Sequence, residues 1–234
     1  MNNHPELSII ILCYRSEKQI LEFADKVKQL AEKLTTSFEI ILVANYIEGT
    51  NDQTMMYVNQ IAKTDKAFVV VSKPKKGMMG WDMREGLNCA KGNLLCVIDG
   101  DGQFPHESIK QCYESISKGP YELVKTYRVI RKDGFYRKFI SSAYNFLFSI
   151  LFGTSFKDIN SKPKIFTREV YSKMSLTSDD WFIDAEIMIN INRLNIRYHE
   201  LPIDFQELSG RKSFVKMGAI LEFTRNMLIH RFKK

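Results

Sequence analysis

The 234-residue sequence has few cysteines, and they form no pattern typical of a metal site or a disulfide framework. The 4 cysteines (Cys13, Cys89, Cys96 and Cys112) include no Cys-x-x-Cys pair, and no histidine lies near them at metal-ligand spacing. Cys13 and Cys96 lie in apolar runs, where a free thiol behaves as a small hydrophobic group. These features favour a protein of a reducing compartment over a secreted disulfide scaffold.

The sequence also lacks a recognisable leader, a linker and a clear membrane-spanning run. Its first residues carry no basic stretch before the short apolar run, so no signal peptide is predicted. No repeat or Pro/Gly/Ser-rich linker divides the chain, which favours one domain over residues 1–234. The longest uncharged stretch, residues 139–156, approaches the ~18 residues of a spanning helix but is diluted by polar residues. Its apolar spacing predicts an amphipathic helix, either packed in the core or lying on a membrane.

What the chain does have is apolar residues and positive charge. Hydrophobic residues make up 44% of the sequence and aromatic residues 12%, so the chain can bury a core and is not disordered. Its 34 Lys and Arg residues exceed the 27 Asp and Glu residues, which gives a net charge of +7. This excess suits a polyanionic partner such as a nucleotide, a lipid phosphate, an anionic membrane surface or a nucleic acid, without choosing among them.

Short β-rich runs alternate with helical segments along the first half of the chain, which predicts a mainly parallel sheet covered on both faces, an α/β fold. Ser16 and Gln19 are spaced as in a capping box that opens the first helix. Ligands bind beyond the carboxyl ends of such strands, where Asn45 and the loops 73–80 and 99–104 converge. Strands are predicted at residues 7–12, 38–44, 68–72, 94–98, 122–126 and 197–205. Helices are predicted from the capping box at 16–19 to about 34, near 54–63, at 184–194 and from about 214.

The clearest chemical signal is Asp99-Gly-Asp101-Gly-Gln103, directly after the strand at 94–98. Glycines free two carboxylates at a strand end, so both can face one point. Mg²⁺ and Mn²⁺ take a few such oxygens and complete their coordination with water and substrate phosphates. A metal held there would neutralise a nucleotide diphosphate and stabilise it as a leaving group. The alternative is a plain Asp-Gly turn.

Here the sequence resembles a known family. VIDGDGQFP resembles the DxD-type motif of family 2 glycosyltransferases with the GT-A fold, most closely the dolichol-phosphate mannose synthase and polyprenyl-phosphate glycosyltransferase branch. The resemblance covers roughly residues 7–215 and implies a mixed, mainly parallel GT-A sheet flanked by helices, with amphipathic helices on the acceptor side. It assigns about residues 1–120 to the nucleotide sugar and about 121–234 to the acceptor. Further matches follow in the family's order: LSIIILCYRSEK, KPKKGMMGWDMREGLNCAKGN, DINSKPKIFTREV and WFIDAEIMININRLNIRYHELPI.

The sequence departs from the family pattern at positions that resemble those holding the base and ribose of the nucleotide. Leu12 stands where proline is usual, Arg15-Ser16 replace Asn-Glu, and Ala44-Asn45 replace an Asp pair. The resemblance therefore does not transfer the donor's identity, UDP-sugar or GDP-sugar.

The resemblance also implies which residues hold the donor. Taken alone, the basic loop at Lys75-Lys76-Gly77 suits phosphate oxygens or is a solvated turn, and Arg84 pairs either with phosphate or with Asp82. The expected metal ligands are Asp99, Asp101 and Gln103, for Mg²⁺ or Mn²⁺. The expected nucleotide and donor residues are Tyr14, Glu17, Asn45, Lys76, Gly77, Asp82, Arg84, Asp99 and Gly100.

On the acceptor side, basic residues alternate with aromatic ones between residues 125 and 141. Arg137 and Ser141 are four apart, so on a helix they share a face and can hold one anion. In the polyprenyl-phosphate branch an Arg-x-x-x-Ser pair of this kind holds the acceptor phosphate, and the neighbouring apolar helix suits a lipid. The alternative is a solvated basic helix edge. The expected acceptor residues are Arg128, Arg131, Arg137, Ser141 and, in a later loop, Arg211, Lys212 and Ser213.

Asp184 and Glu186 are candidate general bases. Two positions apart on a helix, they cannot both face one site, and either is alternatively a helix N-terminal acid that complements the dipole. The resemblance favours Asp184, with Asp101 as a second catalytic carboxylate. A sugar hydroxyl needs a base, whereas a phosphate monoester, with a second pKa near ~6, is largely ionised at neutral pH. With a phosphate acceptor, Asp184 would only position a substrate.

The sequence therefore predicts an inverting, metal-dependent glycosyltransferase that moves a sugar from a nucleotide sugar to a polyprenyl phosphate at the cytoplasmic face of the membrane. Attachment is expected to be peripheral, with a membrane partner or a homo-oligomer as further options. The Asp-rich crevice argues against a nucleic-acid partner. One alternative is transfer to a sugar hydroxyl in surface polysaccharide or lipid-linked oligosaccharide synthesis. Another is a non-catalytic nucleotide-sugar-binding protein, which the altered nucleotide loop supports.

Overall fold

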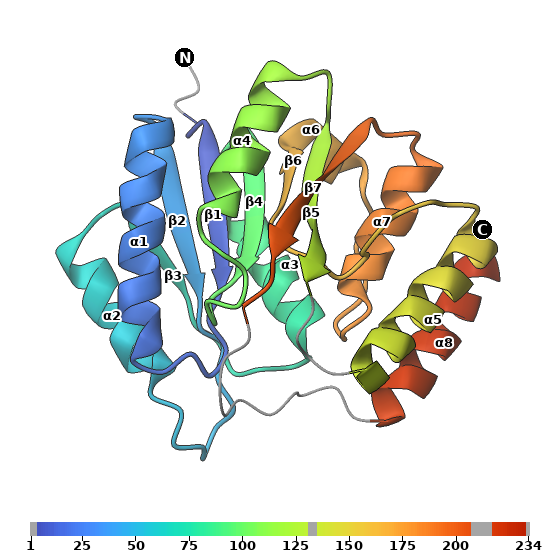
Figure 1. Cartoon of the computed structure of the whole chain (residues 1–234). Coiled ribbons are helices and arrows are strands. Elements are labelled where there is room, and N and C mark those ends of the chain that lie inside the picture. Colours follow the sequence, from blue (N-terminus) through green and yellow to red (C-terminus); the bar gives the residue numbers. More distant parts are fainter. Residues whose placement is uncertain (1–3, 131–134, 207–216, 233–234) are drawn as a thin grey trace.

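The structure is a computed structural model that describes the backbone of residues 4–130, 135–206 and 217–232, and the side chains of residues 4–129, 142–206 and 225–232 (Figure 1). Within these residues, seven strands form one sheet in the order β3-β2-β1-β4-β6-β5-β7. The strands are β1 (Leu7–Leu12), β2 (Phe38–Val43), β3 (Phe68–Val71), β4 (Leu94–Asp99), β5 (Leu123–Ile130), β6 (Lys164–Thr167) and β7 (Tyr198–Asp204). The helices are α1 (Gln19–Leu34), α2 (Thr54–Thr64), α3 (Met79–Cys89), α4 (Ser108–Lys118), α5 (Phe135–Phe152), α6 (Arg168–Lys173), α7 (Ile183–Arg193) and α8 (Met217–Phe232).

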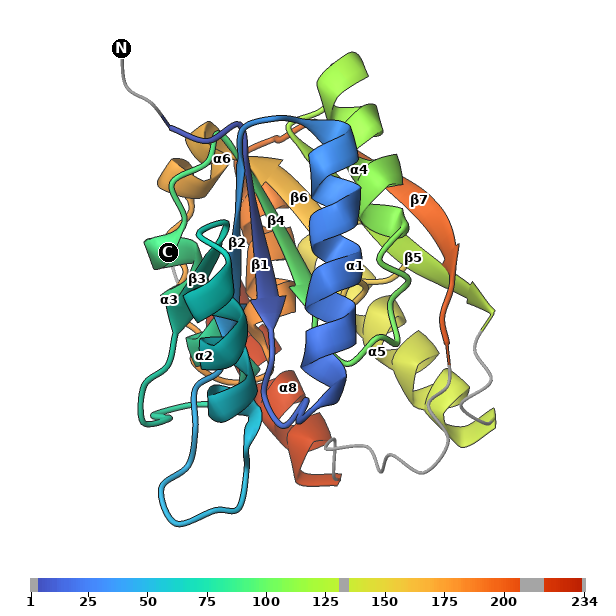
Figure 2. The same ribbon diagram turned by 90° about the vertical axis from the view of Figure 1, so that its left-hand side faces the viewer.

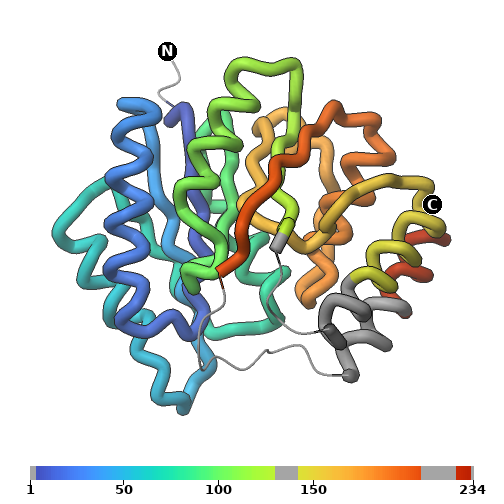
Figure 3. The backbone as a smooth tube through the Cα atoms, viewed as in Figure 1, coloured from blue at the N-terminus to red at the C-terminus, as the bar shows by residue number. Residues whose placement is uncertain are grey.

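The sheet is mixed, and its parallel part comes from the first half of the chain. Strands β1 to β4 pair in parallel, whereas β6 runs antiparallel to both β4 and β5. In the trace of Figure 3, the orange-red β7 lies beside the yellow-green β5, to which it is parallel. Leu12 is opposite both Val43 and Asp99, so β1, β2 and β4 end at one edge of the sheet. The mainly parallel α/β architecture predicted from the sequence is thus confirmed.

Apolar side chains of the central strands pack alternately on the two faces of the sheet, because successive residues of a strand point to opposite sides. Ile10 of β1 belongs to the core cluster that includes residues of α3 and α7, and its neighbours Ile9 and Ile11 belong to the cluster that includes residues of α1 and α4. Figure 2 shows α1 on one side of the sheet and α3 on the other. Both faces are therefore covered, as continuous apolar strands require.

The start of α1 differs from the sequence prediction. Lys18 is the N-cap residue, and no side chain caps the helix, so the capping box predicted from Ser16 and Gln19 is wrong. The Ser16 side chain is instead buried, and its Oγ has no hydrogen-bond partner among the described residues. Arg15 and Glu17, on either side of it, have φ values of 53° and 50°, which are unusual for residues with a Cβ atom. This backbone turns Ser16 inward and away from capping.

Helix α5 is amphipathic and contacts α8 along the edge of the molecule (Figure 1). Its Phe148 is fully buried in the core, whereas Phe146 and Ile150 are 68% and 63% exposed. The helix therefore packs with one face and leaves a second apolar face to solvent. Among the described residues, no helix has the length and apolar character needed to cross a membrane.

Candidate active site

A pocket lies at the carboxyl ends of β1 and β4, where the sequence predicted a crevice. Loops that follow these two strands form one side, and residues from the start of α3 and from the segment before α7 form the other. Its wall combines apolar side chains with three carboxylates and one ammonium, the mixture expected for a small polar ligand. The lining residues are Leu12, Tyr14, Ser16, Lys75, Met78, Met79, Asp82, Asp99, Asp101 and Trp181.

Asp99 and Asp101 are held at the pocket by the turn that follows β4. Gly100 lets the chain pass close to β1, since a Cβ atom there would lie only 3.1 Å from the carbonyl oxygen of Leu12. The backbone N–H of Gln103 donates to Asp101 Oδ1 at 3.0 Å and fixes that carboxylate. Gln103 is a described residue that does not line the pocket, so its role as a metal ligand stays a prediction.

The two carboxylates fit a Mg²⁺ or Mn²⁺ site that a substrate completes. Burial raises the pKa of Asp99, and the nearby Asp101 and Asp184 add to the rise, while Lys162 opposes it. Among the described residues, no group of three or more His, Cys, Asp or Glu side chains could hold a metal ion. Mg²⁺ commonly uses one or two carboxylates together with substrate phosphates. This pair therefore suits a metal that is bound jointly with a nucleotide.

Polar residues on one side of the pocket form one network. The Asn45 side-chain amide donates to Asp82 Oδ1 at 2.9 Å, and Lys75 forms an ion pair with the same carboxylate. The Lys75 ammonium also lies 4.4 Å from the centre of the Tyr14 ring. Burial lowers the pKa of Lys75 and raises that of Asp82, and their ion pair opposes both shifts. The structure thus places Tyr14, Asn45 and Lys75 around Asp82, whereas Lys76 of the same basic loop is exposed; the roles of these residues in donor binding stay predictions.

Three other residues predicted to bind the donor, Gly77, Arg84 and Glu17, instead lie against or bond to other parts of the protein. A Cβ atom at Gly77 would lie 2.6 Å from the carbonyl oxygen of Asp179, and Arg84 forms an ion pair with the same residue. Glu17 Oε2 accepts a hydrogen bond from the backbone N–H of Gln53 at 3.3 Å. None of these three donor candidates, all within the described residues, lines the pocket. Their roles in donor binding stay predictions.

Behind the pocket, Asp184 is enclosed by two lysines: Lys162, which lies two residues before β6, and Lys164, the first residue of β6. Its Oδ2 lies 2.9 Å from Lys162 Nζ and its Oδ1 lies 2.5 Å from Lys164 Nζ, with all three side chains no more than 2% exposed. Lys162 Nζ also lies 3.4 Å from Asp99 Oδ2. Burial alone would raise the pKa of Asp184, but the two ammonium groups outweigh it and lower the pKa. Burial lowers the pKa of Lys164 to about 8.

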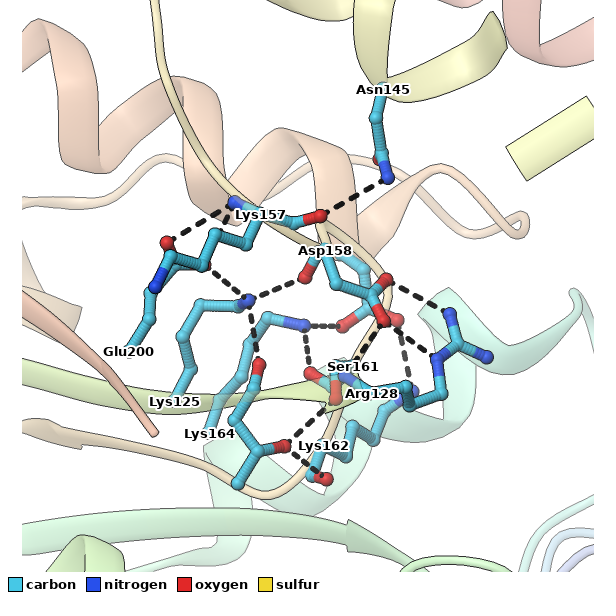
Figure 4. Close-up of polar contacts among 11 residues, drawn as sticks. Lys125, Arg128, Asn145, Lys157, Asp158, Ser161, Lys162, Lys164 and Glu200 are labelled. Atoms are coloured by element: carbon cyan, nitrogen blue, oxygen red, sulfur yellow. Dashed lines mark hydrogen bonds and ion pairs between the residues drawn. The ribbon is translucent and has the colours of Figure 1, made fainter. Parts of the chain in front are cut away.

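A second network of buried charges lies beside the first and ties β5 to β7 (Figure 4). The fully buried Lys125 has its Nζ 3.1 Å from Glu200 Oε1. Arg128 donates from Nε and Nη2 to the Asp158 carboxylate at 2.6 and 2.9 Å. Arg128, predicted to hold an acceptor phosphate, therefore already has a carboxylate partner, and its acceptor role stays a prediction.

Glu186 has different partners from Asp184, as their spacing predicted. Its carboxylate accepts hydrogen bonds from the backbone N–H and the hydroxyl of Thr177 at 3.0 and 2.8 Å, and from the backbone N–H of Ser178 at 2.8 Å. Glu186 therefore fixes the loop before α7, and Asp184 alone faces the charged residues behind the pocket.

A family model, Glycosyl transferase family 2, matches residues 8–183 of this sequence. The chain belongs to glycosyl transferase family 2. Dolichyl-phosphate beta-glucosyltransferases of Saccharomyces cerevisiae and Mus musculus are each 24% identical, over 94% of this chain and 74% and 75% of their own lengths. An undecaprenyl-phosphate 4-deoxy-4-formamido-L-arabinose transferase of Pectobacterium atrosepticum is 26% identical, over 72% of this chain and 50% of its own. The family and the enzyme class predicted from the sequence are confirmed.

The fold of this family 2 glycosyltransferase also matches solved structures. The glucosyl-3-phosphoglycerate synthase of Mycobacterium tuberculosis, crystallised with Mn²⁺, uridine diphosphate and phosphoglyceric acid, superposes with a TM-score of 0.75 at 16% identity. The match covers 97% of this chain and 78% of that one. The GT-A fold is thereby confirmed.

Most of the predicted acceptor residues of the glycosyltransferase fall where the structure gives no side-chain contacts. Arg137 and Ser141 lie on α5, but their side chains are outside the described part of the chain. The predicted residues that lie outside the described ranges altogether are Arg131, Arg211, Lys212 and Ser213.

The structure adds residues that sequence analysis did not assign to the site. Trp181 lines the pocket, and Lys125, Lys162 and Lys164 are buried behind it. The available signal was the position of two of these lysines, since Lys125 interrupts the apolar run LVKTY and Lys164 directly precedes the apolar pair Ile165-Phe166. Lysine is almost never fully buried without a partner, so such lysines predict buried acids nearby.

Proposed function

We propose that this glycosyltransferase moves a sugar from a nucleotide sugar to a polyprenyl phosphate, with inversion at the anomeric carbon. The relatives named above for dolichyl-phosphate and undecaprenyl-phosphate substrates support this acceptor class. The charged pocket at the carboxyl ends of β1 and β4 supports a phosphate-bearing donor. Residues 1–120 would hold the donor and residues 121–234 the acceptor.

The state of Asp184 is the observation that favours a phosphate acceptor over a sugar hydroxyl. A hydroxyl acceptor needs a general base, and an effective base has a pKa near the operating pH. Both Asp184 oxygens are engaged by ammonium groups, at 2.9 and 2.5 Å, and its pKa is lowered. Such a carboxylate is a weak proton acceptor. A phosphate acceptor needs no base, because it is largely ionised at neutral pH.

The reaction then requires positioning and charge compensation. A phosphate oxygen of the acceptor forms a bond to the anomeric carbon while the bond from that carbon to the donor diphosphate breaks on the opposite face. Mg²⁺ or Mn²⁺ held by Asp99 and Asp101, with Gln103 as a further candidate ligand, would stabilise the departing diphosphate. Lys75 places an ammonium in the donor pocket, held by Asp82. Asp184 keeps its two lysines in place behind the pocket.

An exposed apolar surface on α5 and α8 supports a lipid acceptor. It is named the α5–α8 patch here. Arg225 and Arg231 of α8 are exposed as well, so positive charge accompanies the apolar side chains. Apolar groups combined with basic residues suit an anionic membrane surface. We propose that this patch attaches the enzyme peripherally to the cytoplasmic face of the membrane. It consists of Phe146, Ile150, Leu228, Ile229 and Phe232, exposed by 45–78%.

Lipid-extractable product tests the proposal. Purified protein would be mixed with Mn²⁺ or Mg²⁺, a panel of radiolabelled nucleotide sugars and a short polyprenyl phosphate, and label would be counted in the organic phase. We expect label from one donor, and its loss in Asp101→Ala. Asp25→Ala, which removes an exposed carboxylate of α1, is the matched control and is expected to keep full activity.

Other outcomes would select the alternatives. Transfer only to oligosaccharide acceptors, with no label in the organic phase, would refute the phosphate acceptor and assign Asp184 the role of base. Nucleotide-sugar binding without turnover on any acceptor would favour a non-catalytic binding protein.

A further inference from the structure

Lys162 contacts both Asp99, which lines the pocket, and Asp184, which is buried behind it. Its ammonium lies 3.4 Å from Asp99 Oδ2, 2.9 Å from Asp184 Oδ2 and 3.4 Å from the sulfur of Met79. Asp99 and Met79 line the pocket, whereas Lys162 is 2% exposed behind them. A fixed positive charge therefore stands directly behind one of the two carboxylates at the candidate metal position.

The backbone around Lys162 is held independently of its ammonium. The Thr126 hydroxyl of β5 donates to the carbonyl oxygen of Lys162 at 2.6 Å, and it also hydrogen-bonds the Ser161 hydroxyl at 2.8 Å. Figure 4 shows Lys162 and Ser161 in this arrangement. The side chain is thus aimed at the two aspartates by its own main chain.

The two lysines on Asp184 have different reach. Lys164 accompanies Lys162 on Asp184, so Asp184 keeps a buried counter-charge when Lys162 is replaced. Within the described residues, no second lysine or arginine forms an ion pair with Asp99. The positive charge beside Asp99 therefore comes from Lys162, whereas the positive charge beside Asp184 comes from both Lys162 and Lys164.

We propose that Lys162 is a positioning residue that orients Asp99 and weakens the affinity of the Asp99–Asp101 pair for a bare divalent cation. Its charge offsets one of the two negative charges that attract the ion, and in a partly buried site such a charge acts with little screening. The metal is then held firmly only when diphosphate oxygens complete its coordination, so it enters and leaves with the nucleotide. This inference rests on the proposed function, since it assumes a metal at Asp99 and Asp101.

Mn²⁺ binding to the nucleotide-free protein, followed by electron paramagnetic resonance, tests the inference without turnover. We expect Lys162→Met to bind Mn²⁺ at least about tenfold more tightly than the wild type, because the opposing charge is gone. Lys162→Arg keeps the charge and is expected to stay near the wild-type affinity. Lys164→Met is the matched control, since it removes an equally buried charge from Asp184 without touching Asp99, and its effect is expected to be clearly smaller.

A second uncharged variant tests whether the effect of Lys162→Met comes from misfolding. A kinetic measurement then distinguishes a positioning role of Lys162 from a purely structural one. Lys162→Gln keeps a hydrogen-bond donor for Asp184 without the charge, and circular dichroism would verify the fold of each variant. In turnover assays, both uncharged variants are expected to need less Mn²⁺ for half-maximal rate while their kcat falls. A structural defect alone would lower kcat without lowering the Mn²⁺ requirement.

The outcomes separate this inference from the proposed function. Mn²⁺ binding that is lost in Asp101→Ala but unchanged, or weakened, in folded Lys162→Met and Lys162→Gln overturns the role of Lys162 and leaves the metal site standing. Equal tightening in Lys162→Met and Lys164→Met also overturns it, because the effect would then be one of general charge. No Mn²⁺ binding by any variant, with or without nucleotide, overturns the metal site and this inference together.

Discussion

Replacing Asp184 by asparagine should destabilise the fold, because two buried lysines, Lys162 and Lys164, lose the carboxylate with which they pair. Removing one partner of a buried ion pair typically costs about 3–5 kcal/mol. Lys162 would keep Asp99, but Lys164 would keep only the carbonyl oxygen of Ser161, at 2.9 Å, among its described partners. Because burial already holds the pKa of Lys164 at about 8, the lysine can lose its proton, at ~1.4 kcal/mol per pH unit. We therefore expect the lower end of the range, about 3 kcal/mol at pH 7.

Urea denaturation at several pH values would measure this loss, which corresponds to a fall in Tm of roughly 6–12 °C for a domain of this size. The pKa of Lys164 is lower in the folded than in the unfolded chain, so the lysine is mostly neutral in the folded state above pH 8. Its attraction to Asp184 is present below pH 8 and fades above it. The loss caused by Asp184→Asn should thus be smaller at pH 9 than at pH 7.

Glu186→Gln is the matched control for this prediction. Glu186 lies on the same helix and is as buried as Asp184, but its partners are neutral donors of Thr177 and Ser178. Its replacement leaves no buried cation behind and should cost only about 1–2 kcal/mol. Equal losses in the two variants, or a loss for Asp184→Asn below about 1 kcal/mol at pH 7, would refute the reasoning.

Further predictions concern the pocket and the α5–α8 patch. Lys75→Met should raise the KM for the donor about tenfold in a steady-state assay, because it removes a buried ammonium. Lys76→Met, which changes an exposed lysine, should raise the KM less in the same assay. A larger rise in KM for Lys76→Met than for Lys75→Met would contradict the placement of Lys75. Ser16→Ala should leave the Tm unchanged or higher, because the buried Ser16 hydroxyl has no partner among the described residues. The same change should weaken nucleotide binding, as measured by calorimetry. A lower Tm with unchanged binding would show that the hydroxyl has a structural role instead. Phe146→Ser with Ile150→Ser should abolish sedimentation with anionic vesicles without lowering the Tm, since both side chains are exposed; unchanged sedimentation would remove the patch from membrane binding.

Most of the sheet could be predicted from the sequence because its signals are local. The run Leu7–Leu12 contains three successive β-branched residues at 9–11, and the strand it predicts has the same bounds in the structure. Helix α4 was not predicted, although its buried residues Ile109, Cys112, Tyr113 and Ile116 recur every three or four positions. That pattern is short and follows directly on the Asp99–Gln103 motif, whose glycines favour a loop.

The site could be predicted only where its residues are close in sequence. Asp99 and Asp101 belong to one turn, so their convergence follows from the motif alone. The pairing of Asp184 with Lys162 and Lys164 depends on β6 entering the sheet antiparallel between β4 and β5, and no local pattern encodes that placement. Charge pairs between residues on different strands and helices can therefore be identified only once the fold is known.

Asp180, in the loop before α7, is bonded to two helices that the sequence keeps far apart. Its carbonyl oxygen accepts the backbone N–H of Gly80 in α3 at 2.9 Å, and its Oδ2 accepts the side-chain amide of Asn226 in α8 at 2.6 Å. Helix α3 begins at the wall of the pocket, and α8 carries part of the α5–α8 patch. Through Asp180, the helix that begins at the pocket wall is therefore linked to the helix that carries part of the surface proposed to meet lipid.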